Sequence, residues 1–467
     1  SHDAGTITSS DICRGQTVSI ANATSASTGT PASSGPVYSW NRSVSPYTSW
    51  TLLTGSNATF SQTMNTPGVY RYRRTATFGC GTPVTTTVDV TVFSTAHVAG
   101  AIDGNDVCPG DPITINSITA ASTGTPASSG PTYSWRRAPG PGFTAWTNLT
   151  GSGDSFTETL ATPGTYRYER RAAFGCGSAV TTTTDINVFS TTHNPGSISN
   201  TTACAGSAFT IASASAASTG TPASSGPTYS WHRAVSPFSS WTPLTGSLAT
   251  FSETMNTPGT YRYRRTATYG CGSPVTTTVD VVVNPLPDPV ISGANNVCQN
   301  DEETYTTPSV AGHTYAWSTT LGTVISTSAN SVTIRWGTVG NGSVTVTETI
   351  TATGCNRTTT PYAVTVNPGP PTAAPAFVSG LTNICRNGTL NLDVSNVATA
   401  IEYIWDFSWI PGTDNATTAT SEISIDLTGL APGPYSVTVA GSNGCGTGPW
   451  MTPAHTFNIN DIPDLAP

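Results

Sequence analysis

The sequence predicts an all-β chain of five tandem antiparallel β-sandwich domains that form an elongated rod. Three observations lead to this prediction. Ten cysteines recur as five evenly placed pairs, and apolar residues alternate with polar ones at a period of two. No window of about 10 to 15 residues has a helical period. Short strands separated by Gly, Pro and Asn turns are typical of a sandwich.

The chain repeats itself, which gives the domain boundaries. The first cysteine of each pair recurs every 87 to 96 residues, and each repeat has a central Tyr-x-Trp, as at Tyr38 and Trp40, and a late Gly-Cys. The first three repeats are near copies, whereas the last two are shorter and diverged. The predicted domains, called the first to fifth repeats below, are 1–94, 95–190, 191–285, 286–370 and 371–467.

The strands of the first repeat follow an immunoglobulin-like order. Val88, Val90 and Val92 fall on one face of their strand, and Tyr70, just after a Pro-Gly pair, has the place of a tyrosine corner. Tyr166, Tyr261 and Tyr435 have the same place in other repeats. The expected strands are the segment before Cys13 (A), 16–21 (B), 37–42 (C, with a buried Trp), 58–64 (E), 68–78 (F) and 85–93 (G).

Ten residues, STGTPASSGP, occur unchanged at 27–36, 122–131 and 218–227. The strand assignment makes them the loop between strands B and C, at the end of the sandwich that faces the preceding repeat. Because the segment has no charge, ring or large apolar side chain, we expect a filler of the joint between repeats or a platform for O-linked glycans. The candidate acceptors are Thr30, Ser33, Thr125, Ser128, Thr221 and Ser224.

The cysteines indicate disulfides and an oxidising compartment, because they are paired and lack C-x-x-C spacing. The pairing we favour from sequence joins the two cysteines of each repeat, beginning with Cys13 and Cys80. The alternative joins neighbouring repeats, since those two cysteines fall in turns at opposite ends of a sandwich. A strand spans about 17 to 20 Å, whereas a disulfide tolerates Cα separations of about 4.4 to 6.8 Å. The alternative pairs are Cys13–Cys176, Cys108–Cys271, Cys204–Cys355 and Cys298–Cys445, which leave Cys80 and Cys385 for a preceding and a following subunit.

Composition excludes several classes of function. All 17 basic residues are Arg and the net charge is -8, which argues against a nucleic-acid groove. The sequence contains no run of 18 apolar residues, so no membrane span is predicted. No catalytic motif, cofactor or metal site is expected, because the acidic residues are scattered among turns. An Asp-rich turn around Asp103 and Asp106 could hold calcium but is absent from the other near copies. His2, His97 and His193 are expected to make polar contacts at joints.

Aromatic residues after strand C raise the question of binding. Trp50, Trp146 and Trp241 are candidates for glycan contact by stacking, whereas the alternative is packing of Arg over the rings on the surface of the sheet.

The fourth repeat resembles a known family. Its segments NVCQNDEETYTT, HTYAWS, GSVTVTETITATGC and YAVTVNPGPP are similar to the PKD-like and Ig-like modules of secreted surface proteins of Bacteroidota. The resemblance implies an extracellular, cell-surface array that acts in adhesion, gliding or the cell coat. We therefore expect a disulfide-stabilised rod that is a subunit or stalk of a surface filament or adhesin, associates with itself head to tail, and binds cell-surface or polysaccharide ligands if any. The alternative is a carbohydrate-binding accessory region of a larger secreted enzyme.

Overall fold

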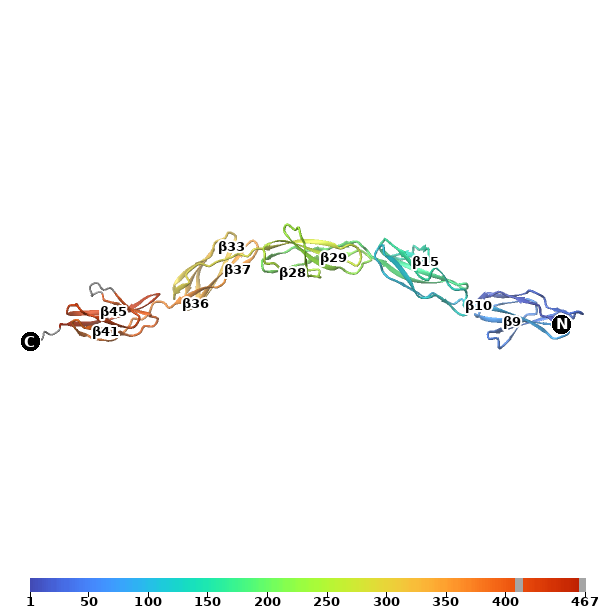
Figure 1. The fold of residues 1–467 in the computed structure, drawn as a ribbon, viewed down its shortest axis with the longest axis horizontal. Helices are drawn as coiled ribbons and strands as arrows, with labels where there is room; N and C mark the ends of the chain where they lie inside the picture. Colours follow the sequence, from blue (N-terminus) through green and yellow to red (C-terminus); the bar gives the residue numbers. More distant parts are fainter. Residues whose placement is uncertain (408–414, 462–467) are drawn as a thin grey trace, which may run out of the picture. The chain divides into compact units, whose positions relative to one another are not determined.

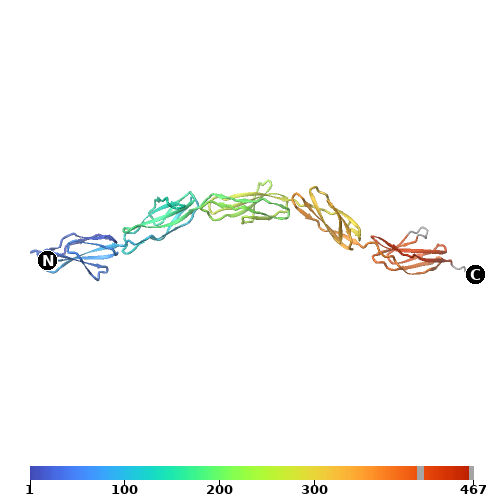
Figure 2. The ribbon, with the colours of Figure 1, turned by 180° about the vertical axis from the view of Figure 1, so that it is seen from behind.

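Every regular element of this protein is a β-strand. The computed structural model describes residues 1–407 and 415–461, and within these ranges it contains strands and turns without a helix. Figures 1 and 2 show these strands from opposite sides. The chain divides into two compact units, one of residues 1–200, 210–251 and 262–280 and one of 201–209, 252–261 and 281–467. The predicted all-β class is confirmed.

The first repeat is a sandwich of two sheets. One sheet has the order β2-β4-β8 and the other β3-β10-β9-β6-β7, with β1 paired to β5 beside them. The predicted strands B, C, E, F and G are β4, β6, β8, β9 and β10; β7 was not predicted. The strands are β1 (His2–Asp3), β2 (Ile7–Thr8), β3 (Ile12–Cys13), β4 (Thr17–Asn22), β5 (Ser27–Thr28), β6 (Val37–Val44), β7 (Thr51–Leu53), β8 (Phe60–Thr63), β9 (Gly68–Thr77) and β10 (Val84–Phe93).

The second and third repeats have nearly the same succession of strands; the second has an isolated parallel bridge, Val107 to Val188, in place of β3, and the third has two strands, β23 and β24, in place of β4. In the second repeat the sheets are β12-β13-β17 and β16-β15-β18-β19. Its strands are β11 (His97–Val98), β12 (Ala101–Gly104), β13 (Pro112–Thr119), β14 (Ser122–Thr123), β15 (Thr132–Pro139), β16 (Thr147–Leu149), β17 (Phe156–Thr159), β18 (Gly164–Ala173) and β19 (Val180–Val188). Those of the third are β20 (His193–Asn194), β21 (Ser197–Ile198), β22 (Thr202–Cys204), β23 (Ala208–Ile211), β24 (Ser213–Ser215), β25 (Ser218–Thr219), β26 (Thr228–Val235), β27 (Thr242–Leu244), β28 (Phe251–Thr254), β29 (Gly259–Thr268) and β30 (Val275–Asn284).

The fourth and fifth repeats keep two sheets each. They have the orders β32-β35-β34 with β31-β38-β36-β33, and β39-β41-β44 with β40-β47-β45-β42-β43. The strands are β31 (Asn296–Cys298), β32 (Glu302–Thr306), β33 (His313–Thr320), β34 (Gly322–Ser328), β35 (Ser331–Trp336), β36 (Gly340–Ile350), β37 (Asn356–Thr358), β38 (Tyr362–Asn367), β39 (Phe377–Gly380), β40 (Asn383–Cys385), β41 (Thr389–Val394), β42 (Glu402–Asp406), β43 (Ala416–Thr418), β44 (Glu422–Asp426), β45 (Gly433–Asn443), β46 (Gly446–Trp450) and β47 (His455–Asn460).

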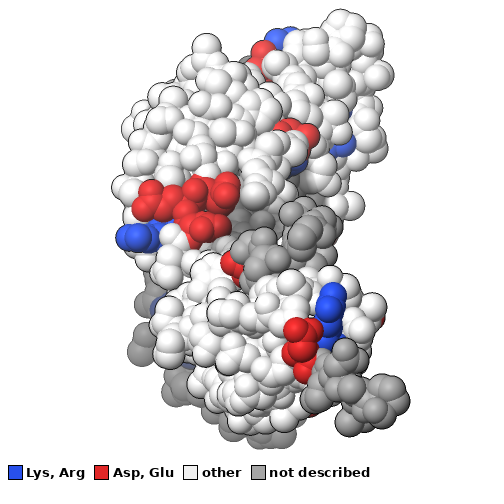
Figure 3. All heavy atoms as spheres, turned by 90° about the vertical axis from the view of Figure 1, so that its left-hand side faces the viewer, with Lys and Arg blue, Asp and Glu red and all other residues white. Residues whose placement is uncertain are grey.

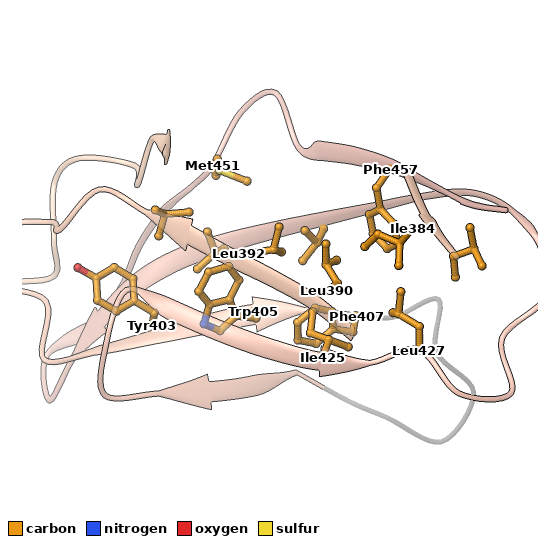
Figure 4. Packing of buried hydrophobic residues seen from close by; sticks show 14 of the residues in the cluster. Ile384, Leu390, Leu392, Tyr403, Trp405, Phe407, Ile425, Leu427, Met451 and Phe457 are labelled. Atoms are coloured by element: carbon orange, nitrogen blue, oxygen red, sulfur yellow. The ribbon is translucent and has the colours of Figure 1, made fainter. Parts of the chain in front are cut away.

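Each core forms around an aromatic residue between two sheets. In the fifth repeat Trp405 of β42 is fully buried among the side chains of β41 and β44, including Leu392 and Ile425 (Figure 4). Trp40, Trp135 and Trp231 are likewise buried at the predicted strand C. The fourth repeat differs, because its fully buried Trp is Trp336 of β35, while the Tyr-x-Trp residue is only partly buried.

The tyrosine corners are confirmed. The Tyr70 hydroxyl donates to the carbonyl oxygen of Thr66 at 2.8 Å, four residues upstream. The same bond recurs at Tyr166, Tyr261 and Tyr435, which donate to Thr162, Thr257 and Ala431. The corner fixes the start of strand F in relation to the turn before it.

Candidate functional site at the joints between repeats

Four disulfides join neighbouring repeats. The pairs are Cys13–Cys176, Cys108–Cys271, Cys204–Cys355 and Cys298–Cys445, with Cα separations of 5.4 to 5.7 Å. They are the pairs of the alternative set, and the pairing within repeats that the sequence favoured is wrong.

The position of the cysteines on the strands gives the reason. Cys13 ends β3, which runs parallel to β10 and places this residue opposite Phe93, the last residue of β10. Cys80 lies just before the first residue of the same strand, Val84. Ten extended residues span about 30 Å. The two cysteines of one repeat therefore lie at opposite ends of their sandwich, too far apart for a disulfide.

Cys80 and Cys385 are exposed free thiols. We expected all ten cysteines to form disulfides, and this expectation is wrong for these two within a single chain. They are the first late cysteine and the last early cysteine of the series, and the other eight cysteines are already bonded to one another.

A histidine holds the turn that carries the late cysteine. Nε2 of His193 lies 2.6 Å from the carbonyl oxygen of Cys271, its Nδ1 lies 3.0 Å from Oγ1 of Thr219, and its ring stacks on Tyr269 with the centroids 4.3 Å apart. His97 contacts Cys176 and stacks on Phe174 in the same way. The expected polar contacts of these histidines are confirmed, and they place the histidine against the disulfide.

The repeated loop is part of the joint. In the second repeat Ser122 and Thr123 pair as β14 with His97 and Val98, and the carbonyl oxygen of Pro126 accepts a hydrogen bond from the Ser94 amide at 3.0 Å. The third repeat repeats this pattern with β20–β25 and with the Ser190 amide bonded to Pro222 at 2.8 Å. Residues 140–143 of the second repeat and Thr221 and Pro222 of the loop in the third repeat line one surface hollow of about 490 Å³. The loop therefore faces the preceding repeat, as predicted.

The same loop also supports the cysteine turn. A Cβ added to Gly175, next to Cys176, would overlap Oγ of Ser129 in the loop, and Gly270 and Ser225 have the same relation. The loop thus fills the space beside the turn that carries the late cysteine. Its small side chains are required by this close approach, which accounts for a segment without large residues.

The loop serines are poor glycan acceptors. Ser128 and Ser224 are buried, and the hydroxyl oxygens of both, like that of Ser33, have no solvent access and no hydrogen-bond partner among the described residues. These three expected acceptors are corrected, because a glycan requires an accessible hydroxyl. The threonines of the set, Thr30, Thr125 and Thr221, are exposed.

A buried arginine ties each of the first three repeats to its joint. Arg74 of β9 is fully buried and donates to the carbonyl oxygens of Ala4 at 2.7 Å and Ala58 at 3.1 Å and to Oδ1 of Asn22 at 2.6 Å. Its guanidinium lies 5.0 Å from the centroid of Tyr38, and burial lowers its pKa. Arg170 and Arg265 make the equivalent bonds to Ala99 and Pro195. The segment after each joint is thus held in the sandwich.

The sequence could have indicated this arginine. In VYRYRR, Tyr70, Tyr72 and Arg74 have the same parity, so alternation places the arginine on the face of the two apolar rings. Alternation therefore buries the third as well. Arg71 and Arg73 are on the other face and are partly exposed.

Arginine covers a face of each candidate tryptophan. Arg73 lies 4.2 Å from the Trp50 ring centroid and Arg264 lies 4.3 Å from that of Trp241. In the second repeat the residue opposite Arg136 of β15 is Glu169, where the first repeat has Arg73. Here Arg136 itself stacks on the tryptophan, with its guanidinium 4.4 Å from the Trp146 ring centroid. Glu169 accepts hydrogen bonds from Arg136 at 2.7 and 3.0 Å. Because the stacking is preserved when the arginine changes strand, the structure favours packing as the role of these rings.

The acidic turn of the second repeat is a structural feature. The Asp106 carboxylate accepts hydrogen bonds from the backbone amide of Asn187 at 2.7 Å and from its side chain at 3.1 Å. Asp103 accepts a hydrogen bond from the Gly104 amide at 2.9 Å. These bonds hold the turn against the last strand, so both carboxylates have a role that requires no metal.

The second unit builds its joint differently. Asn443 of β45 donates to the carbonyl oxygens of Gly369 at 2.8 Å and Thr399 at 3.1 Å, and a Cβ added to Gly446 would lie 3.2 Å from Pro370. Asp288, in the segment that opens the fourth repeat, pairs with Arg357 at 2.7 Å. Proline-rich segments thus replace the histidine and the ten-residue loop while the disulfide remains.

Charge is sparse on this surface. Figure 3 shows, on one face, a few groups of acidic and basic side chains on a surface that is otherwise uncharged. Within residues 1–407 and 415–461, no helix is long and apolar enough to cross a membrane.

Comparisons with known proteins agree with a PKD-like fold. The PKD-like domain family matches residues 284–365 and 370–453, and no curated protein matches. Among solved structures, the chain is similar to Sidekick-1 immunoglobulin domains 1–5, with 14% identity over 97% of this chain and 96% of that one and a TM-score of 0.21. It is also similar to three N-terminal domains of the bacteriophage RB49 outer capsid protein Hoc, with 12% identity over 60% and 98% and a TM-score of 0.31. The strand orders and the family match together confirm tandem immunoglobulin-like and PKD-like β-sandwich domains.

Proposed function

We propose that this protein is an extracellular structural protein of the adhesion type, which serves as a stalk or subunit of a bacterial cell-surface filament or adhesin. The observation that carries the proposal is the set of four disulfides that cross from one repeat to the next. A disulfide inside a domain stabilises that domain, whereas these bonds keep neighbouring domains together. Such an arrangement suits a protein that transmits force.

The contacts around the disulfides support the same role. In tandem arrays each module contacts its neighbours, so the joint is the weak point under load. Here the disulfide Cys13–Cys176 and the hydrogen bond from the Ser94 amide to Pro126 cross the joint, while the ladder between β11 and β14 and the buried Arg170 hold the segment after the joint in the second repeat. A covalent link between two well-anchored repeats favours a stalk that resists separation.

The location and source are part of the proposal. Disulfides persist in oxidising compartments, which supports an extracellular site. The fold is typical of noncatalytic structural modules, so we propose no enzymatic activity. The sequence resemblance to surface proteins of Bacteroidota suggests such a bacterium as the source, and the exposed loop threonines are the remaining candidates for O-linked glycans.

The proposal is tested on cells that make the protein. Intact cells are treated with a protease, and the protein is purified without reductant for disulfide mapping. We expect loss of the protein from intact cells and peptides that link Cys13 to Cys176 and Cys108 to Cys271. Protection from the protease, or peptides that link the cysteines of one repeat, would contradict the proposal.

Polysaccharide binding distinguishes the alternative function. An accessory binding region would retain the full chain on an insoluble polysaccharide, and Trp146→Ala would release it. Arg171→Ala, which alters an exposed arginine of the same repeat, is the matched control. We expect no retention of either variant or of the wild type, since the Trp146 ring already packs against Arg136.

A further inference from the structure

We propose that Cys385 of one copy forms a disulfide with Cys80 of a second copy, and that this bond reproduces the joint found within the chain. The inference rests on the proposed structural function and names the partner as another copy of the same protein. Its evidence is the structure around the two free thiols, which matches that around the bonded cysteines.

Cys80 lies in a turn already shaped like its bonded counterparts. It stands between Gly79 and Gly81, and Gly81 has a φ of 94°, close to the 83° and 84° of the equivalent Gly177 and Gly272. Its carbonyl oxygen lies 2.6 Å from Nε2 of His2, as Cys271 lies from His193. The His2 ring stacks on Phe78 with the centroids 4.5 Å apart.

Exposure separates Cys80 from these counterparts. Cys176 and Cys271 are each only 5% exposed, whereas Cys80 is exposed. In the bonded joints the preceding repeat contributes the partner sulfur and the Ser94 or Ser190 contact to the loop. The first repeat has the histidine, the glycines and the loop of this half-joint, and Cys80 lacks a partner sulfur among the described residues.

Cys385 lies in the complementary half-joint. It ends β40, which runs parallel to β47 and places it opposite Asn460, as Cys298 is opposite Asn367. Its carbonyl oxygen accepts a bond from the amide three residues later at 3.0 Å, and Cys13, Cys204 and Cys298 have this bond at 3.0 to 3.1 Å. The Arg386 amide bonds Asn460 at 2.9 Å, as Gln299 bonds Asn367.

The two thiols are therefore one of each kind. Each of the four disulfides among the described residues joins an early cysteine, next to a short parallel strand or bridge, to the late cysteine of the following repeat. The free pair is one early and one late cysteine. A second copy supplies both missing halves without any other protein, and the reaction can continue at each new end.

The bond forms by thiol–disulfide exchange. The thiolate of Cys80 attacks a small-molecule or oxidoreductase disulfide and releases one thiol of that carrier. The thiolate of Cys385 from the other copy then attacks Sγ of Cys80 and releases the second thiol. The two cysteines lose two electrons and two protons, and the carrier disulfide is reduced to two thiols.

The test uses the purified full chain at high concentration in a glutathione redox buffer. Non-reducing electrophoresis is expected to show dimers, trimers and longer covalent species that collapse to one band with reductant. Cys80→Ser and Cys385→Ser, each alone, are expected to stay monomeric, and their mixture is expected to stop at a dimer. Peptide mapping of the wild-type ladder should give a Cys80–Cys385 link.

Three outcomes would overturn this inference. They are symmetric Cys80–Cys80 or Cys385–Cys385 links, a link between the two cysteines of a single monomer, and free thiols under conditions in which the internal disulfides are complete. In native material, a Cys80 peptide bonded to a different protein would also reject a second copy as the partner. Each result leaves the four internal disulfides in place, so this proposal can fail while the structural function stands.

Discussion

Single residues at the joints carry interactions that their type alone would not suggest. Arg74 and Arg265 are charged side chains whose pKa is lowered by burial, and they bond to uncharged acceptors rather than to carboxylates. The hydrogen bonds donated by the two terminal nitrogens offset the burial of the guanidinium, although its Nε has no partner among the described residues, and removal of the side chain leaves carbonyl groups without partners. These arginines therefore stabilise the repeat by connecting the segment after the joint to strand F.

Replacing the buried arginine tests this role. Arg170→Leu is expected to lower the free energy of unfolding of the second repeat by about 3 kcal/mol, because several buried acceptors lose their donors. The matched control is Arg171→Leu at the adjacent exposed position, with an expected loss of under about 0.5 kcal/mol. Urea unfolding of the full chain, followed by hydrogen exchange of peptides from the second repeat, measures both. Equal losses would refute the role of burial.

Surface ion pairs contribute in a pH-dependent way. Arg71 donates two hydrogen bonds of 2.7 Å to Asp89 and thereby lowers the pKa of that carboxyl. Since the pKa is lower in the folded state, the contribution is complete above the unfolded value of about 4 and is lost as the pH falls through the folded value. Solvent weakens the pair, because its side chains are 38% and 44% exposed.

Asp89→Asn is therefore expected to lower the unfolding temperature of the first repeat by about 1 to 3 °C at pH 7. The difference from the wild type should shrink below about pH 4 and vanish once Asp89 is protonated. Calorimetry of the full chain between pH 2 and 7 measures it, with Asp154→Asn as the control at an exposed position. A difference that stays constant over this range would show that the charge is irrelevant.

At the scale of elements, the strands were predictable and the supports of the joints were not. Period-two alternation located β4, β6, β8, β9 and β10, since one face of each must meet the core. The same signal missed β7 and the pair β1–β5, because strands of two or three residues have too few positions to show alternation. The loop was placed from the order of the strands, but its contacts with the preceding repeat and with the cysteine turn of its own repeat could not be derived from its composition.

The pairing of the cysteines shows a second limit. Spacing in sequence favours partners within one repeat, whereas the length of β10 separates these cysteines in space. The predicted strand order already placed the two cysteines of a repeat at opposite ends of a sandwich. Choosing the disulfide pairing from it depends on where each strand begins and ends, which the sequence alone does not define. The burial of Ser128 likewise follows from how the loop folds back on the joint, which the composition of the loop does not reveal.

The glycine turn offers a test at this scale. Gly177 has a φ of 83°, and a Cβ there would overlap Nε2 of His97. Gly177→Ala is expected to lower the free energy of unfolding of the second repeat by about 1 to 2 kcal/mol, because the backbone is strained and the histidine is displaced. Gly130→Ala, where an added Cβ meets open space, is the control. Faster hydrogen exchange at residues 93–99 in the first variant alone is the expected readout.

At the scale of the whole molecule, the disulfides change which residues bear a load. The disulfides enclose 147 to 163 residues each, and successive ones overlap in sequence, since Cys108 lies between Cys13 and Cys176. Force applied to the ends takes the shortest covalent route. That route crosses to Cys176, follows the chain to Cys204, crosses to Cys355, returns to Cys298 and crosses to Cys445.

Single-molecule stretching measures this route. Between Cys13 and Cys445 the route includes about 85 residues instead of about 430, so the fully extended length should be on the order of 300 Å with the disulfides intact and 1,500 Å after reduction. The variant Cys204→Ser/Cys355→Ser should lengthen the oxidised chain, since the load must then use the bond between Cys108 and Cys271. Cys80→Ser/Cys385→Ser is the control, because neither thiol lies on the route. If oxidised and reduced chains reached the same length, the disulfides would not carry the load, and the protein would resist force through its folded domains alone.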